Sequence, residues 1–181
     1  MSHNAILQNP TLLDLSGYQL WDFAGVDGLQ CAKALFGEAS GRIAPFQSFE
    51  TSLNGCLCSV LRLCEGNFRI GLQGKTTGFE QAIAQLQPNH QIWVKRCEWM
   101  SAIAIPETLL LNLLPQIASS KAPHRLEGLQ LSCAAPARID GISVLIWRHQ
   151  LLGQPAFELH TALKDVEAVQ AKVSNYLIFS G

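Results

Sequence analysis

The hydrophobic pattern of the C-terminal part of the chain predicts two strands followed by a helix. Residues Ile142 to Trp147 form an apolar, β-branched run after the turn pair Asp140-Gly141. Residues Phe157 to His160 alternate apolar and polar positions, as in a half-buried strand. From Leu163 to Tyr176, apolar residues recur at three- and four-residue spacing, which predicts a helix with one apolar face.

The same order of two strands and a helix is predicted earlier in the chain. The turn pair Asn54-Gly55 precedes an apolar strand from Cys56 to Leu63, and a second strand runs from Phe68 to Leu72. A helix follows, with its apolar face at Phe79, Ala82, Ile83 and Leu86. This stretch therefore predicts a hairpin and a helix, as the C-terminal stretch does.

A strand and a helix also precede each hairpin, in Tyr18 to Phe36 and in Ile92 to Ile117. Each strand breaks at a helix-start signal, Gly25-Val26-Asp27 in one and Pro106-Glu107-Thr108 in the other. The chain thus predicts an α+β fold of strand-helix-strand-strand-helix units in residues 1–88 and 89–181, packed as one globular unit. We expect antiparallel or mixed sheets with helices on one face. Low residue identity between the units leaves a duplication open.

Composition excludes some classes of function. The chain has 181 residues, of which 15% are charged and 48% hydrophobic, so its surface is low in charge or its core is large. A surface low in charge is typical of a protein that buries an interface with a partner, and a large core is the alternative. The net charge of -1 gives no basic footprint for nucleic acid.

We expect a cytoplasmic protein. The longest apolar stretches, Ile103 to Leu114 and Ile142 to Trp147, are too short or too interrupted to cross a bilayer. Residues Met1 to Pro10 form a polar lead-in without the basic region and apolar core of a signal peptide. The 6 cysteines lack the density of a secreted disulfide scaffold and fit free thiols.

The cysteines and the Gly-Lys-Thr motif do not predict a metal or phosphate site. Cys56, Cys58 and Cys64 share one strand parity, but Cys58 and Cys64 would lie roughly 20 Å apart at ~3.3 Å per residue. No C-x-x-C is present, so buried thiols are expected and no metal site. Gly74-Lys75-Thr76 resembles the end of a phosphate loop, but Arg69 stands where its first glycine is required.

Two aspartates are candidates for binding an amine or folate ligand. Asp22 lies within a strand between two aromatic residues. If it is buried there, its carboxylate would serve as a base or bind a cation. The alternative is that Asp22 lies on an edge strand and faces water. Asp27 lies at a helix start. His149 and His160 fall on the final hairpin and are expected to be solvated or hydrogen-bonded. Trp21, Trp93, Trp99 and Trp147 are candidate interface anchors, with core packing as the alternative.

Four segments carry a resemblance to a known family: Leu20 to Asp27, Gly66 to Leu72, Val144 to Arg148 and Phe157 to His160. From about Gly17 to Tyr176, the chain resembles the gamma subunits of heterotetrameric sarcosine oxidases. These subunits share the folate-binding fold of the glycine-cleavage aminomethyltransferases.

The resemblance implies an accessory subunit of an oxidoreductase complex, without an active site or cofactor of its own. Its partners would be larger flavoprotein subunits that carry flavin and tetrahydrofolate, oxidise an N-methyl amine and pass on the one-carbon unit. The chain lacks the further domain of the aminomethyltransferases, and Ala104-Ile105-Pro106 replaces their Ser-Gly-Pro junction. The alternatives are a stand-alone folate-dependent one-carbon transferase using Asp22 or Asp27, and a ligand-binding α+β domain.

Overall fold

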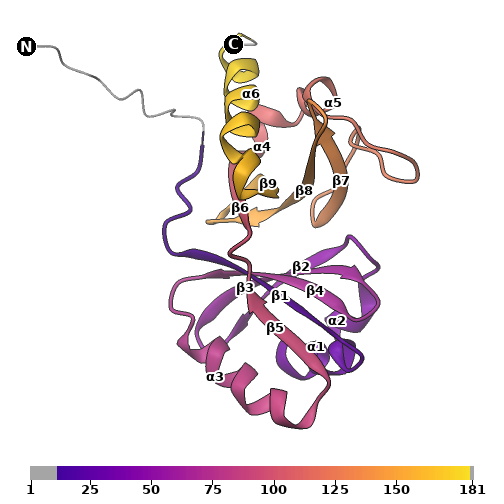
Figure 1. Cartoon of the computed structure of the whole chain (residues 1–181), viewed down its shortest axis with the longest axis vertical. Coiled ribbons are helices and arrows are strands. Elements are labelled where there is room, and N and C mark those ends of the chain that lie inside the picture. Colours follow the sequence, from indigo (N-terminus) through magenta and orange to yellow (C-terminus); the bar gives the residue numbers. More distant parts are fainter. Residues whose placement is uncertain (1–11, 180–181) are drawn as a thin grey trace, which may run out of the picture.

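A computed structural model describes residues 12–179, in which the strands form two stacked antiparallel sheets with helices on their outer faces (Figure 1). The predicted polar lead-in of residues 1–10 lies outside this range. Within the range, no helix is long and apolar enough to cross a membrane. The chain passes from one sheet to the other at residues 97–99.

The first sheet has the order β2-β3-β4-β1-β5. Its strands are β1 (Tyr18–Gly25), β2 (Ser48–Leu53), β3 (Cys56–Cys64), β4 (Asn67–Gln73) and β5 (Ile92–Arg96). Its helices are α1 (Gly28–Phe36), α2 (Ala39–Arg42), α3 (Thr77–Leu86) and the 3-10 turn η1 (Gln87–Asn89). One face of this sheet forms an apolar core with the helices. Its strands contribute Phe23, Phe68 and Ile70, which pack against Phe36 of α1 and Phe79 of α3.

The second sheet has the order β6-β9-β8-β7. Its strands are β6 (Met100–Pro106), β7 (Cys133–Ile139), β8 (Ile142–Leu151) and β9 (Gln154–Ala162). Its helices are α4 (Glu107–Leu110), α5 (Leu114–Ile117), the 3-10 turn η2 (Leu163–Asp165) and α6 (Val166–Phe179). Val169 and Val173 of α6 pack on Ile146 and Leu159 of the sheet, which forms a second apolar core.

The predicted repetition is visible in the strand order. Read from its edge strand β7, the second sheet runs β7-β8-β9-β6, which matches β2-β3-β4-β1 in the first sheet. Each copy contains one strand more than the predicted unit, β2 in the first and β7 in the second. Pro136 interrupts the strand pattern of β7, and it is tolerated there because β7 is an edge strand.

The strand predicted after Ile92 is two strands in different sheets. β5 completes the first sheet, and β6 begins the second, so the division between the sheets falls at residues 97–99 and not at the predicted residue 88. The helix expected up to Ile117 is likewise split into α4 and α5, with Pro115 in the first turn of α5. Leu163 precedes α6 and is largely exposed, so it does not belong to the apolar face.

The three cysteines of β3 do not all lie in the same environment, contrary to what their shared strand parity had predicted. The strand register shifts between Arg62 and Cys64, and Cys64 is exposed while Cys56 and Cys58 are buried. All described cysteines are free thiols. No group of three metal-ligating side chains occurs within residues 12–179.

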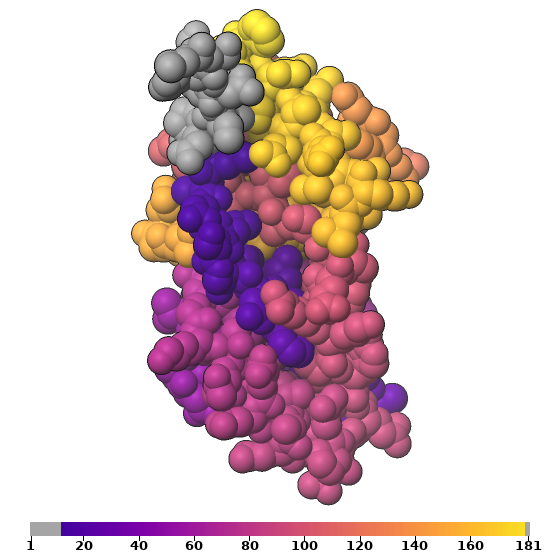
Figure 2. Space-filling model, turned by 60° about the vertical axis from the view of Figure 1, so that its left-hand side comes forward, coloured from indigo at the N-terminus to yellow at the C-terminus, as the bar shows by residue number. Residues whose placement is uncertain are grey.

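The segment before β1 connects the two halves along their surface (Figure 2). Leu13 donates a backbone hydrogen bond to Ala104 of β6, and Leu13 and Leu15 pack against Leu151 and Ala156. The chain then enters the first sheet as β1. Residues near the N-terminus therefore cover part of the second sheet before joining the first.

Candidate functional site

The inner faces of the two sheets meet at a buried carboxylate, Glu158 of β9. Glu158 is fully buried and accepts hydrogen bonds from Tyr18 Oη at 2.8 Å, His149 Nε2 at 2.6 Å and His160 Nε2 at 2.7 Å. Because an ionised carboxylate only accepts hydrogen bonds, both Nε2 atoms must carry protons. Tyr18 comes from the first sheet, so Glu158 joins the two sheets directly.

A second carboxylate, Asp22 of β1, reaches the same interface through Arg69. The Arg69 guanidinium binds both Asp22 oxygens, at 2.7 and 2.9 Å, and its Nη1 lies 3.2 Å from His160 Nδ1. Since Arg69 is a donor, His160 Nδ1 must be an acceptor, and His160 is neutral. Burial, aided by the charge of Arg69, lowers the pKa of His160 despite the attraction of Glu158.

His149 is the histidine of the group whose pKa is raised. Its ring stacks on Trp147 with centroids 3.7 Å apart, and its Nδ1 faces Glu50 Oε1 at 3.6 Å. Burial acts to lower the pKa of His149, but Glu158 and Glu50 outweigh burial and raise it. Burial likewise acts to raise the pKa of Glu158, but the two histidines outweigh it and hold that pKa far below its usual range. The network thus contains the Asp22–Arg69 ion pair, a carboxylate that accepts three hydrogen bonds, and one neutral histidine.

The two histidines should give opposite pH dependences of stability. The His149 pKa is raised above 6.5, so its contribution is complete below pH 6.5 and is lost as the pH rises through the raised value. The His160 pKa is lowered, so its contribution is complete above pH 6.5 and is lost as the pH falls through the lowered value. We expect the stability cost of His149→Gln to shrink above pH 6.5, and that of His160→Gln to shrink below it. Urea unfolding at a series of pH values measures both costs, and parallel pH profiles would contradict the charge assignment.

The structure places the two candidate aspartates apart. Asp22 faces the second sheet from β1, an interior strand, and is paired with Arg69, so it is not an edge-strand residue in water. Asp27 lies in the loop after β1, where its Oδ2 accepts a hydrogen bond from the backbone N–H of Gln91 at 2.6 Å. Asp27 makes no side-chain cap on α1. Each carboxylate therefore already has a protein partner.

The four tryptophans differ in exposure. Trp147 is fully buried between the sheets, which agrees with the alternative of core packing, and its Nε1 donates to Ser48 Oγ at 2.9 Å. Trp21 packs on Phe79 in the core beneath the first sheet. Trp93 and Trp99 are 50% and 43% exposed, with ring centroids 6.2 Å apart. Among the tryptophans, the exposed surface is therefore concentrated at Trp93 and Trp99.

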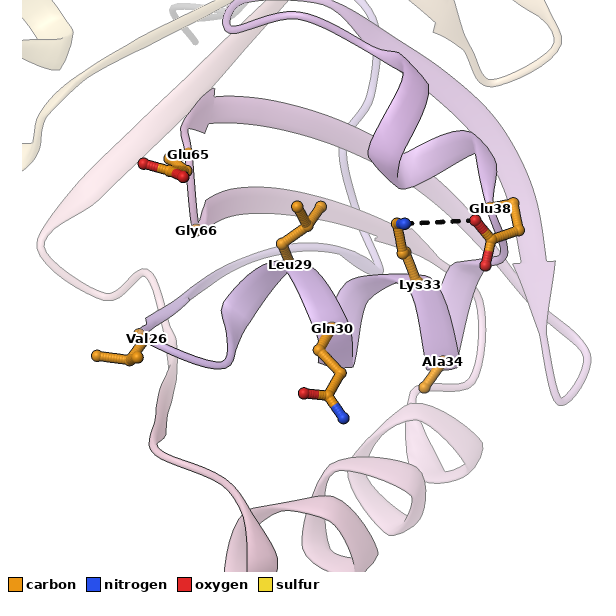
Figure 3. Close-up of a pocket in the computed structure, with 9 residues that line it drawn as sticks. Val26, Leu29, Gln30, Lys33, Ala34, Glu38, Glu65 and Gly66 are labelled. Atoms are coloured by element: carbon orange, nitrogen blue, oxygen red, sulfur yellow. Dashed lines mark ion pairs between the residues drawn. The ribbon is translucent and has the colours of Figure 1, made fainter.

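A surface pocket of about 870 Å³ lies along α1 (Figure 3). The turn at Gly66 approaches the start of α1 so closely that a Cβ on Gly28 would lie 1.9 Å from the Gly66 carbonyl oxygen. The pocket contains one ammonium group, Lys33, which pairs with Glu38 at 3.4 Å, and a second carboxylate, Glu65. Its lining is therefore more acidic than basic.

Solved structures share this architecture, although no known family model and no curated protein matches the sequence. Aminomethyltransferase T of the glycine cleavage system from Bartonella henselae aligns with a TM-score of 0.66 and 17% identity, over 90% of this chain and 44% of that chain. The chain has the aminomethyltransferase-like fold. A heterotetrameric sarcosine oxidase from Corynebacterium sp. U-96 aligns with a TM-score of 0.62 and 12% identity, over 92% of this chain and 81% of that chain.

Only part of the buried network was predicted from the sequence. Asp22, His149 and His160 were candidate residues, whereas Glu158, Arg69 and Tyr18 were not. Glu158 and His160 occupy the polar positions of an alternating strand, a pattern that predicts contact with water. One sequence signal does indicate the buried network. The strand that begins at Tyr18 has no purely polar face, which predicts that both of its faces are buried.

Proposed function

We propose that this chain is an accessory, non-catalytic subunit of a cytoplasmic, flavin-dependent sarcosine or N-methyl amine oxidase complex that passes one-carbon units to tetrahydrofolate. The observation that carries the proposal is the state of the buried network. Glu158, Asp22, Arg69 and both histidines bind one another between the sheets. In this arrangement, no member of the network is presented to a substrate for proton transfer.

The structural comparisons favour a subunit over a complete transferase. The chain spans less than half of the aligned aminomethyltransferase, but 81% of the aligned chain of the sarcosine oxidase. The second alignment also covers 92% of this chain, so those two chains are of similar length. A chain of this size with the same fold is thus a component of a heterotetramer in that relative.

We place flavin and tetrahydrofolate on the partner subunits. The pocket along α1 fits folate poorly, because the glutamate tail of folate is anionic. It would meet Glu38 and Glu65, while Lys33 is already paired with Glu38. The free cysteines agree with a reducing, cytoplasmic location for the complex.

The second candidate is a stand-alone folate-binding one-carbon transferase or ligand-binding domain, and the observation behind it is that the chain has a surface pocket of about 870 Å³. The pocket is lined by Gly25 and Val26, which immediately precede Asp27. Asp27 accepts the Gln91 N–H through one oxygen, Oδ2, so its other lone pairs remain available to an amine.

Purification from the native host separates the two functions. We expect the tagged full-length chain to retain larger partners and to elute with a flavin absorption band, because its proposed chemistry resides on those partners. Mass spectrometry identifies the partners, and a visible spectrum detects the flavin. A colourless monomer that binds tetrahydrofolate would instead establish the second candidate.

A further inference from the structure

The strand edges of the two sheets are covered to different extents. Arg138 of β7 exchanges two backbone hydrogen bonds with Ser119, and Ala104 of β6 accepts one from Leu13. Ser48 of β2 donates one to Ser132. Within residues 12–179, no other strand or loop bonds to the outer side of β5, and only two local bonds, Ile92 N–H to the His90 carbonyl and Glu98 N–H to the Arg96 carbonyl, engage its ends. An uncovered edge presents free backbone groups to any added strand.

The register of β5 shows which of its groups are free. Cys97 donates its backbone N–H to Leu20 of β1, and hydrogen-bonded residues alternate along an antiparallel strand. Trp93 and Lys95 therefore bond to β1, while the backbone N–H groups of Val94 and Arg96 point to the open edge. These two donors have the spacing that a further antiparallel strand requires.

The exposed side chains around this edge are two tryptophans, two cations and one carboxylate, Glu98. Trp93 and Trp99 form an exposed pair, and the Lys95 ammonium lies 5.7 Å from the Trp99 ring centroid. Lys95 and Arg96 are exposed and make no ion pair with a described residue. The chain has a net charge of -1, so this is a local basic site on a weakly acidic protein.

A pocket of about 240 Å³ adjoins the C-terminal end of β5. Its lining includes Leu20, Arg96, Cys97 and Met100. Burial raises the pKa of Cys97 to about 12, so its thiol is neutral and this wall of the pocket is uncharged. The pocket is large enough for a single apolar side chain next to the basic edge.

We infer that β5 is a docking edge for an extended acidic segment of a partner protein, which adds a strand beside Val94 and Arg96. Because side chains alternate along a strand, carboxylates on one face of the segment meet Arg96, and apolar side chains on its other face rest on Trp93 and Trp99 beside Lys95. A second copy of this chain is disfavoured as the occupant, because pairing two β5 edges brings like charges together. The identity of the partner, a subunit of the amine oxidase complex, rests on the proposed function. The docking edge itself can be tested without that complex.

The first test compares tagged full-length variants in capture from the native host. The double charge reversal Lys95→Glu/Arg96→Glu should abolish capture, and Trp93→Ala should weaken it by at least about 30-fold, as for an interface hot spot. Lys121→Glu/Arg125→Glu makes the same change in charge on an exposed loop and should capture normally. Hydrogen exchange of the captured complex should show protection of residues 92–99. Capture that persists in the β5 variants, with protection elsewhere, overturns the docking edge and leaves the proposed function standing.

The second test applies if the wild-type chain captures nothing, an outcome that would itself contradict the proposed function. Tryptophan fluorescence then follows titration with two synthetic peptides of alternating sequence, Glu-Val and Lys-Val. We expect the acidic peptide alone to bind, and the β5 charge reversal to weaken that binding by roughly ten-fold or more. Equal binding of both peptides, no binding, or a dimer that the charge reversal dissociates would overturn the inference.

Discussion

Glu158→Gln is expected to lower the free energy of unfolding by about 3–5 kcal/mol, the usual cost of breaking a buried ion pair. The carboxamide keeps the shape of the side chain but leaves the His149 charge without its buried partner. Its NH₂ group would also oppose one of the N–H or O–H donors that now converge on Glu158. Urea unfolding at neutral pH, followed by tryptophan fluorescence, measures the loss.

The matched control for this substitution is Glu127→Gln. Glu127 is exposed on the loop before β7, so its substitution should change stability by less than about 0.5 kcal/mol. If the two variants were equally stable, the carboxylate of Glu158 would contribute nothing, and the description of the network as an ionic link between the sheets would be refuted.

Asp22→Asn is expected to cost about 2–3 kcal/mol of stability while the folded chain still captures its partners. The substitution removes the charge that Arg69 binds with two hydrogen bonds in a largely buried position. Under the proposed function, Asp22 has a structural role, so the loss appears in unfolding and not in partner capture. Denaturant unfolding and co-purification from the native host give the two readouts.

Asp27→Ala serves as the comparison for Asp22→Asn. It removes one hydrogen bond to the Gln91 backbone and should cost about 1 kcal/mol. The accessory role would be contradicted if either variant kept its stability and partners but lost a tetrahydrofolate-dependent reaction. That outcome would assign the aspartate to a transferase.

Local patterns predicted most of the secondary structure, but not how strands are shared between the sheets. The strands from Tyr18, Cys56, Phe68 and Ile142 were found because each combines an apolar pattern with a turn signal. β2 and β7 were missed because Gly, Ser and Pro near them resemble loop sequence. The break at residues 97–99 was missed because no Gly or Pro marks a turn there, and the change of sheet depends on tertiary packing.

The candidate site was less predictable, because its chemistry arises from residues distant in sequence. Asp22 was noticed as a carboxylate between aromatic residues, but its partner Arg69 lies 47 positions further along the chain. Glu158 and His160 alternate with apolar residues, and their cover is another sheet and not water. Local periodicity cannot distinguish a face that meets solvent from one that meets a second polar face.

The hydrogen bond between Tyr18 and Glu158 joins residues 140 positions apart, which also constrains the order of folding. As the chain is synthesised, the first sheet can close its apolar core against α1 and α3 before β8 and β9 exist. Its inner face, with Tyr18 and Arg69, then has no partner until nearly the whole chain has been made. Contacts of such long sequence separation slow folding, so this face would be the last to be protected in the nascent protein.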